Sequence, residues 1–306
     1  MINEYYILFI IINYGKEIAI FLYIYTIAFL GGSMTEKHLI ALDLDGTLLR
    51  DDKTISKRTK ATLQTLMEQG HYVMIATGRP YRSSARYYQE LALKTPIVNF
   101  NGAFVHHPLT TSWGSFHTPL DIGVAKEIVD ACNSYSFHNI IAEIQDDVYL
   151  HYQDEKLLDI FNMGNPKITI GDLRNYLPDS PTSLLIHAEP DDVTNIRAHL
   201  SEVHAEVIDH RRWGDPFHVI EIVKSGLNKA IGIQRVAKHL DIPQSRIIAF
   251  GDEDNDLEML EYASIGVAMG NGISDVKNIA NVTTASNEED GIALFLEDKF
   301  NLKKVL

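Results

Sequence analysis

Two aspartates separated by a single residue form the pattern in this sequence with the clearest chemical meaning. Asp43 and Asp45 lie in the segment 43–47 and directly follow the apolar run 39–42. Side chains two residues apart on an extended chain point the same way, so both carboxylates can face one site. Carboxylates that close repel each other unless a cation or a shared proton lies between them. A plain turn is the alternative, because Asp-Gly is a common turn pair.

Two further segments carry groups that suit a phosphate. Thr77 and Gly78 place a hydroxyl and an exposed backbone amide at an expected helix start, which makes a good anion cradle. Lys229 opens another expected helix, where the helix dipole does not favour a cation, and this indicates a point charge for phosphate. The commoner alternatives are a helix-capping threonine and a solvated surface lysine.

The most specific segment is acidic and follows the apolar run 247–250. Its five consecutive acidic or amide residues are Asp252, Glu253, Asp254, Asn255 and Asp256. Such a cluster at the end of a strand needs a cation or a hydrogen-bonding network. Asn255 and Glu258 also fit a helix capping box. An EF-hand loop is excluded, because its sixth position is Leu257 rather than glycine.

Together these segments supply what phosphoryl transfer needs. They contain an oxygen nucleophile, carboxylates that a hard cation can join to phosphate, and positive or N–H groups for the phosphoryl oxygens. Ligand sets made only of oxygen suit Mg²⁺, which binds one or two carboxylates together with substrate phosphate and waters. The sequence therefore predicts Mg²⁺ as the cofactor.

The elements that must position these groups follow an alternating pattern from His38 onward. Short apolar runs alternate with helical periodicity, which is typical of a parallel sheet with crossover helices. Strands are expected at 39–42, 72–76, 97–98, 247–250 and 265–268. One helix is expected between the N-cap Ser56 and Gly70, and another through Ile233 and Leu240. The candidate groups lie at strand ends or helix starts, where open α/β sheets bind ligands.

The middle and the beginning of the chain differ from this pattern. Residues 106–216 are more acidic and hold nine of the 13 histidines, so we expect an inserted domain between two parts of a core, 34–105 and 217–306. Residues 1–33 are an apolar extension whose longest uninterrupted run, 18–30, is short of the ~20 residues of a spanning helix. Either translation starts at Met34 or the extension is a membrane anchor; membrane contact is expected only in the second case.

Composition excludes some partners. The net charge of −14 argues against a nucleic-acid partner, since such proteins present clustered Lys and Arg. Cys132 is the single cysteine, which excludes an internal disulfide framework and fits a reducing compartment. We therefore expect a cytoplasmic protein.

These motifs resemble those of the haloacid dehalogenase-like hydrolase superfamily, subclass IIB, often called Cof-type phosphatases. The family's D-x-D-G-T-[LI] matches 43–48, its A-T-G-R threonine matches Thr77, its helix-start lysine matches Lys229, and its G-D-x-x-N-D matches 251–256. The resemblance extends from about Met34 to the C-terminus and includes the pair Asn101-Gly102. One departure is Ala230 in place of the usual glycine, which leaves Lys224 as a less favoured substitute for Lys229.

The resemblance implies a role for each acidic residue. Asp43 would be the nucleophile and a metal ligand. Asp45 would protonate the leaving oxygen, then activate water, and would bind the metal through its main-chain carbonyl. Asp252 would complete the metal site, with help from Glu253 or the neighbouring Asp256.

The resemblance also implies a phosphate site, a fold and a reaction. Thr77, Lys229 and Asn255 would hold the phosphoryl oxygens together with the amides of Leu44 and Gly78. The fold would be a doubly wound, Rossmann-like parallel-sheet core with an inserted α/β cap. The reaction would be Mg²⁺-dependent hydrolysis of a small phosphorylated metabolite, with a sugar phosphate expected ahead of a nucleotide or cofactor phosphate.

Two alternatives to hydrolysis remain. A phosphomutase would share the same first half-reaction. A phospho-receiver signalling domain also uses an acidic cluster, a phosphorylated aspartate, a threonine and a lysine. Receivers, however, keep the accepting aspartate alone at a later strand, whereas here the pair Asp43 and Asp45 follows the first strand of the expected core.

Overall fold

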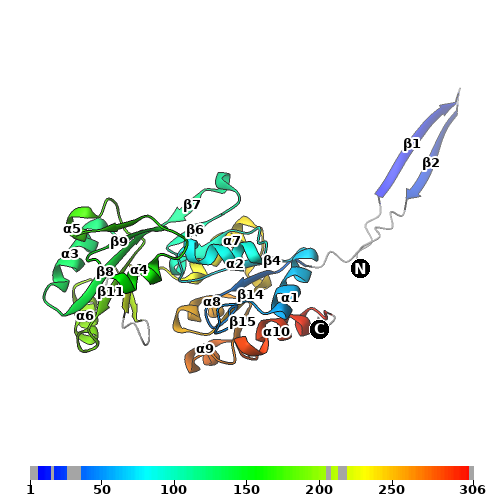
Figure 1. Cartoon of the computed structure of the whole chain (residues 1–306). Coiled ribbons are helices and arrows are strands. Elements are labelled where there is room, and N and C mark those ends of the chain that lie inside the picture. Colours follow the sequence, from blue (N-terminus) through cyan, green and yellow to red (C-terminus); the bar gives the residue numbers. More distant parts are fainter. Residues whose placement is uncertain (1–5, 15–16, 26–35, 205–207, 213–218, 303–306) are drawn as a thin grey trace. The chain divides into compact units, whose positions relative to one another are not determined.

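The computed structural model describes residues 6–14, 17–25, 36–204, 208–212 and 219–302, and the chain divides into two units. In the first unit, β1 (Tyr6–Tyr14) and β2 (Glu17–Tyr25) form an antiparallel pair (Figure 1). Both segments are therefore β-strands, and they lie in the extension that one interpretation of the sequence takes as a membrane anchor. Of the helices in the described ranges, none has both the length and the apolar character needed to cross a bilayer. All other elements belong to the second unit, Lys37–Leu306.

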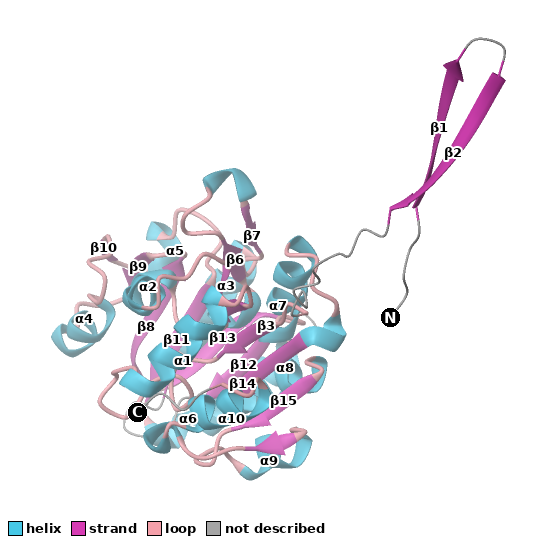
Figure 2. Cartoon of the chain, turned by 90° about the vertical axis from the view of Figure 1, so that its right-hand side faces the viewer, coloured by secondary structure: helices cyan, strands magenta, loops and turns pink. Residues whose placement is uncertain are grey.

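A parallel sheet forms the centre of the second unit, with the strand order β16-β15-β14-β3-β4. Its strands are β3 (Leu39–Leu42), β4 (Tyr72–Ile75), β14 (Ile247–Gly251), β15 (Ile265–Ala268) and β16 (Val282–Thr283). Figure 2 shows β3, β14 and β15 side by side. The strands β3 and β14 are buried along their whole length, which explains why they read as continuous apolar runs. A single parallel bridge from Ala76 to Val98 adds β5 (Ile97–Asn99) beyond β4.

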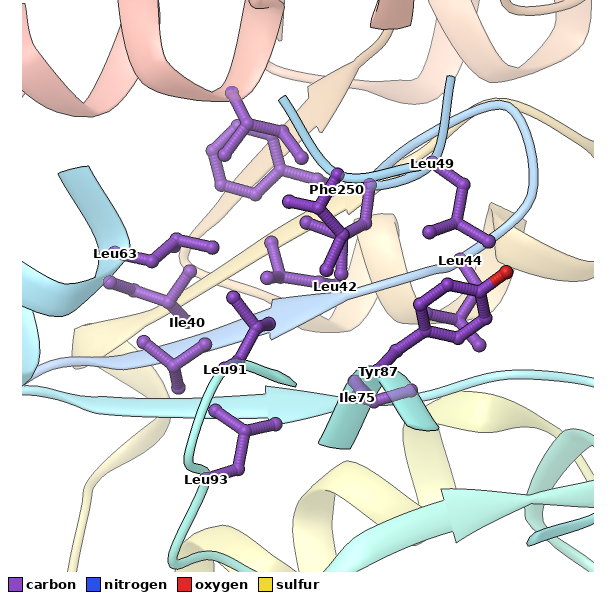
Figure 3. Packing of buried hydrophobic residues seen from close by; sticks show 14 of the residues in the cluster. Ile40, Leu42, Leu44, Leu49, Leu63, Ile75, Tyr87, Leu91, Leu93 and Phe250 are labelled. Carbon is purple, nitrogen blue, oxygen red and sulfur yellow. The ribbon is translucent and has the colours of Figure 1, made fainter. Parts of the chain in front are cut away.

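Helices cover both faces of this sheet. On one face lie α1 (Lys57–Glu68), α2 (Tyr81–Glu90) and α10 (Gly291–Lys299). On the other face lie α7 (Lys229–His239), α8 (Leu257–Tyr262) and α9 (Ser274–Ile279). In the close view of the first face, Leu63 of α1 lies beside Ile40 of β3, and Tyr87 of α2 lies beside Leu44 (Figure 3). The prediction of a doubly wound α/β core is therefore confirmed.

A second, six-stranded sheet has the order β10-β9-β8-β11-β13-β12. Its strands are β8 (Phe137–Ile144), β9 (Asp147–Leu150), β10 (Ile168–Ile170), β11 (Ser183–Ala188), β12 (Ile208–Arg212) and β13 (Val219–Lys224). The helices α3 (Ile122–Cys132) and α6 (Pro190–Val203) pack on one face, and α4 (Glu155–Phe161) packs on the other (Figure 1). The short α5 (Leu173–Tyr176) contacts α3.

Small elements complete the unit. The strands β6 (Phe104–His106) and β7 (Ser115–His117) continue from β5 as an antiparallel three-stranded sheet. The 3₁₀ turns are η1 (Phe100–Gly102), η2 (Thr111–Trp113), η3 (Gln244–Arg246), η4 (Asp254–Asp256) and η5 (Asn287–Glu289).

The pairing of β13 bears on where the inserted domain ends. Ile220 and Ile222 pair with β11 on one side and with β12 on the other, so β13 belongs to the six-stranded sheet although it lies beyond the expected boundary at Pro216. Composition could not reveal this, because an apolar strand reads alike in either sheet. We therefore propose that the cap runs from about residue 118 to Lys224.

Candidate active site

The candidate residues meet at the carboxyl ends of the central strands. Asp43 follows β3, Thr77 follows β4 and Asp252 follows β14. The strand order changes direction at β3, because the next strand along the chain lies on one side of it and β14 lies on the other. Such a switch point is where open α/β sheets leave room for a ligand. The amide of Asp43 donates to the carbonyl of Phe250 at 3.1 Å and so continues the pairing of β3 with β14.

Three buried carboxylates gather at this point. Oxygens of Asp43, Asp252 and Asp256 lie within 4.8 Å of one another, so these residues could hold a metal ion. Glu253, which the resemblance put in the metal site, is not part of this group. Its side chain accepts instead from the amide of Asp256 and caps the turn η4. The capping box thus spans Glu253 and Asp256, and its assignment to Asn255 and Glu258 is wrong.

A glycine permits this close approach. Gly46 has a φ of +75°, and a Cβ built on it would lie 2.1 Å from Oδ2 of Asp252. Asp252 is fixed from the other side, since its Oδ1 accepts from the hydroxyl of Thr47 at 2.6 Å. The Gly46-Thr47 pair therefore positions Asp252 beside Asp43 in addition to forming a turn.

Lys229 lies between two of the carboxylates. Its Nζ donates to Oδ1 of Asp43 and to Oδ1 of Asp256, each at 2.6 Å, and the side chain is fully buried. Burial by itself would lower the pKa of Lys229, but the negative charges of Asp256 and Asp43 raise it above its ordinary value. Oδ2 of Asp256 accepts from the amides of Asp252 and Glu253, so both of its oxygens are engaged. Lys224, the less favoured substitute for Lys229, is exposed at the end of β13.

The charges in this group fit a divalent cation. Burial raises the pKa of Asp43 well above its ordinary value; Lys229 opposes that rise, and Asp256 and Asp252 add to it. Burial likewise raises the pKa of Asp252 to about 7. A single ammonium group thus faces three carboxylates in a site removed from water, and two of them are destabilised as anions. Carboxylate oxygens are the donors that Mg²⁺ prefers, so the residues present fit that ion.

Asp45 lies at the rim of the site and has different partners. Arg79 donates to both of its oxygens, from Nε at 2.6 Å and from Nη2 at 2.5 Å, and Lys53 donates to Oδ1 at 2.8 Å. Burial would raise the pKa of Asp45, but the hydrogen bonds and charges of Arg79 and Lys53 lower it below the ordinary value. Neither Arg79 nor Lys53 was given a role from the sequence, although Arg79 stands within the matched A-T-G-R motif.

The expected phosphate cradle is built around a strained turn. The hydroxyl of Thr77, which is buried, accepts from the amide of Arg79 at 3.1 Å. Phe100 and Asn101 both have left-handed backbones, with φ of 49° and 51°. Two such residues in succession are costly outside glycine, and strain of this kind gathers at functional sites. The turn brings the Asn101 side chain against Gly78, and its Oδ1 accepts from Nδ2 of Asn255 at 3.1 Å.

Leu44 can serve the site only through its backbone. Its side chain is fully buried in the apolar core between the sheet and α2, where Figure 3 labels it beside Tyr87. Its carbonyl accepts from the amides of Thr47 and Leu49 and closes the loop that carries Asp45. The expected role for the Leu44 amide remains a prediction.

A cavity of ≈ 380 Å³ joins this centre to the six-stranded sheet. The core and the cap both line it, with residues Asp43, Asp45, Thr77, Gly78, Arg79, Pro80, Arg82, Asn101, Glu143, Phe161, Glu221, Glu253 and Asn255. Lys229 and Asp252 are buried and are not among these lining residues. Sequence reasoning missed Arg82, which lies on α2 of the core just outside the matched motif. It also missed Glu143, Phe161 and Glu221, because no motif marks a cap residue. It noted Asn101 only as one half of an Asn-Gly pair.

Comparison with known proteins agrees with this architecture. The family of haloacid dehalogenase-like hydrolases matches residues 40–296. The chain is 63% identical over 268 residues to the 5-amino-6-(5-phospho-D-ribitylamino)uracil phosphatase YitU of Bacillus subtilis, covering 88% of this chain and 99% of that protein.

Solved structures agree as well. A haloacid dehalogenase-like hydrolase from Bacteroides thetaiotaomicron superposes with a TM-score of 0.73 at 26% identity, covering 86% of this chain and all of the other. A subclass IIB sugar phosphatase shares the fold with a TM-score of 0.74 at 22% identity, covering 87% of this chain and all of the other. The resemblance of the four motifs to the haloacid dehalogenase-like hydrolases is thus confirmed, and the chain belongs to that family.

Proposed function

We propose that this phosphatase hydrolyses a small phosphate monoester through a phosphorylated Asp43, with Mg²⁺ as its cofactor. The observation that carries the proposal is the position of Asp43. Its carboxylate is buried at the switch point of the sheet, bonded to Lys229 at 2.6 Å, and faces a cavity that also holds Asp45 and Thr77. An oxygen nucleophile, a proton donor and anion-binding groups therefore line one cavity.

In the first half-reaction, an oxygen of Asp43 attacks phosphorus and the bond from phosphorus to the ester oxygen breaks. Asp45 gives its proton to the departing oxygen, so the leaving group is released as an alcohol. Arg79 and Lys53 hold both oxygens of Asp45 as a carboxylate before substrate binds. We propose that Asp45 turns from these two cations toward the ester oxygen, loses the interactions that lower its pKa, and takes up from solvent the proton that it then donates.

In the second half-reaction, water attacks the phosphorus of the aspartyl phosphate. Asp45, now a carboxylate, accepts the proton of this water, and the bond from Asp43 to phosphorus breaks to release inorganic phosphate. The loop that positions Asp45 thus serves both steps, first as acid and then as base.

The phosphoryl oxygens need positive or N–H groups throughout. We propose that Thr77, Lys229 and Asn255 supply them, together with the amides of Leu44 and Gly78. When bound, Mg²⁺ would offset the negative charge that the carboxylates and the phosphoryl group bring together. Asp43, Asp252 and the main-chain carbonyl of Asp45 would hold it.

For the substrate, we propose 5-amino-6-(5-phospho-D-ribitylamino)uracil, on which the 63% identical relative is named as acting. Its phosphate is attached to a sugar-alcohol chain. This substrate is therefore a more specific form of the sugar-phosphate class that the sequence predicts. A cavity of ≈ 380 Å³ suits a leaving group of this size. We also propose the cytoplasm as the compartment, since Cys132 is a free thiol buried in the cap.

The test combines turnover with capture of the intermediate. Purified protein with Mg²⁺ and this substrate should release inorganic phosphate, and borohydride treatment of quenched enzyme should convert Asp43 to homoserine. Asp43→Asn should lower turnover by several orders of magnitude and remove the captured product, because an amide is a poor nucleophile. A folded Asp43→Asn protein that keeps more than a few per cent of the wild-type rate would refute the assignment of Asp43 as the nucleophile. Transfer of the phosphoryl group to a second alcohol, without release of inorganic phosphate, would identify a phosphomutase.

A further inference from the structure

The wall of the cavity opposite the catalytic centre is one face of the six-stranded sheet. Leu185 of β11 stands opposite Ile141 of β8 and Glu221 of β13, and Ser183 stands opposite Glu143 of β8. Alternate residues on paired strands share a face, so these five side chains project to one side. The opposite side carries α3 and α6. This face therefore turns Glu143 and Glu221 toward the cavity that contains Asp43.

The carboxylate of Glu143 is already used to fasten the cap to the core. Arg82, on α2 of the core, forms an ion pair with it, and both side chains are 5% exposed. The hydroxyl of Ser183 donates to its other oxygen at 3.1 Å. Beside this pair, the amide of Arg82 donates to Oδ1 of Asp146 at 2.8 Å. These contacts give Glu143 a structural role at the seam between cap and core.

Glu221 lines the same cavity from β13, on the other side of β11 from Glu143. It is 7% exposed and lines the cavity together with Phe161, a side chain of α4 that is also 7% exposed. An ionised carboxylate has about four acceptor positions and no donor, so it can accept from a ligand in addition to its protein contacts. Phe161 adds a flat apolar surface beside it. The cap thus presents a hydrogen-bond acceptor and a ring to whatever is attached to the phosphate.

We propose that Glu221 determines substrate specificity by accepting hydrogen bonds from hydroxyl or amino groups of the leaving group, while Phe161 packs against its ring. A buried carboxylate also repels a second anionic group, since two like charges at close range are costly in a site removed from water. The leaving group is therefore uncharged, rich in O–H or N–H donors and flat at one end. This inference rests on the proposed phosphatase function and assigns the residue that selects the substrate.

The test compares two substrates in three proteins. The ratio of kcat/KM for 5-amino-6-(5-phospho-D-ribitylamino)uracil to kcat/KM for p-nitrophenyl phosphate should fall by about tenfold or more in Glu221→Leu, because donors of the bound ligand lose their acceptor. Glu221→Gln keeps one acceptor oxygen, so the ratio should fall less in this variant. Glu202→Gln, an exposed glutamate of α6, is the matched control and should leave the ratio unchanged.

A second comparison uses charge and does not depend on the identity of the natural substrate. Glu221→Gln should raise kcat/KM for ribose 1,5-bisphosphate relative to ribose 5-phosphate, because the repulsion of the second phosphate is removed. Equal losses on all substrates would show a structural role for Glu221 and overturn the inference, as would unchanged ratios in both comparisons. Wild-type protein that hydrolyses none of these esters would refute the proposed function itself, which is a separate result.

Discussion

Single residues set the distances on which the site depends, and Gly46 is the sharpest case. The φ of this residue is +75°, and Oδ2 of Asp252 occupies the space that a Cβ would take. We expect Gly46→Ala to displace Asp252 and to lower kcat/KM by about 100-fold, since a misplacement of ~1 Å at a reacting centre has effects of that order. The Mg²⁺ concentration for half-maximal activity should rise as well. Both are measured in a steady-state titration with the metal.

Gly226→Ala is the matched control for that change. Gly226 has nearly the same φ, +77°, but no atom lies within 4 Å of the position of its Cβ. It should lose about 1–2 kcal/mol of stability from the left-handed backbone and keep its metal requirement. If both variants lose activity equally, backbone strain rather than the approach of Asp252 explains the effect.

The sequence predicted residues that belong to short motifs and missed those that reach the site by folding. Asp43, Thr77 and Asn255 could be named because a strand end or helix start follows from local periodicity, and all three line the cavity. Their catalytic roles remain predictions. Glu221 could not be found, because its place depends on which strands pair with β13.

At the scale of elements, the start of α7 determines where Lys229 lies. The side chain of Asn228 caps this helix by accepting from the amide of Ile231 at 3.0 Å. Asn228→Ala should lower the free energy of unfolding by about 1 kcal/mol. It should also lower kcat, because a frayed first turn releases the ammonium that is bonded to Asp43. Chemical denaturation and steady-state kinetics measure the two effects separately.

Ser56→Ala provides the comparison at the same scale. Ser56 caps α1 by accepting from the amide of Thr59 at 3.0 Å, as the sequence predicted, and lies outside the cavity. It should show the same loss of stability with kcat unchanged. A loss of kcat in Ser56→Ala as large as in Asn228→Ala would contradict a specific link between the cap of α7 and the position of Lys229.

Element boundaries show what local patterns can and cannot give. The helix predicted after Ser56 and the strands predicted at 39–42 and 265–268 are present with those limits, because caps and apolar runs act locally. The capping box was placed two residues late, because the chain first makes the 3₁₀ turn η4 before α8 begins. Sequence spacing alone does not distinguish the two kinds of helical turn.

For the whole molecule, removal of the metal should abolish activity reversibly. Chelation with EDTA should stop turnover, Mg²⁺ should restore it, and Ca²⁺ should restore it poorly, because its larger and looser coordination spoils the in-line geometry. Mg²⁺ should also raise the melting temperature of the wild type and have little effect on Asp252→Asn. Full activity after exhaustive chelation would refute the proposed requirement for a metal ion.

A protein that begins at Met34 should keep the kcat/KM of the full chain. Every candidate site residue lies in the unit Lys37–Leu306, as do both larger sheets. Circular dichroism and kinetics on the two proteins measure fold and activity. A shortened protein that fails to fold, or that folds and loses activity, would show that residues 1–33 contribute to the enzyme.

The central place of β3 in the sheet has a consequence for synthesis on the ribosome. Its neighbour β4 follows within 30 residues of Leu42, but its other neighbour, β14, begins only at Ile247, after the whole cap. At a synthesis rate of about 5–20 residues per second, one edge of β3 stays unpaired for roughly 10–40 s. An apolar, unpaired edge is a template for association with other chains. Nascent chains stalled before β14 should therefore bind chaperones or aggregate, and those stalled after β15 has left the exit tunnel should be protected.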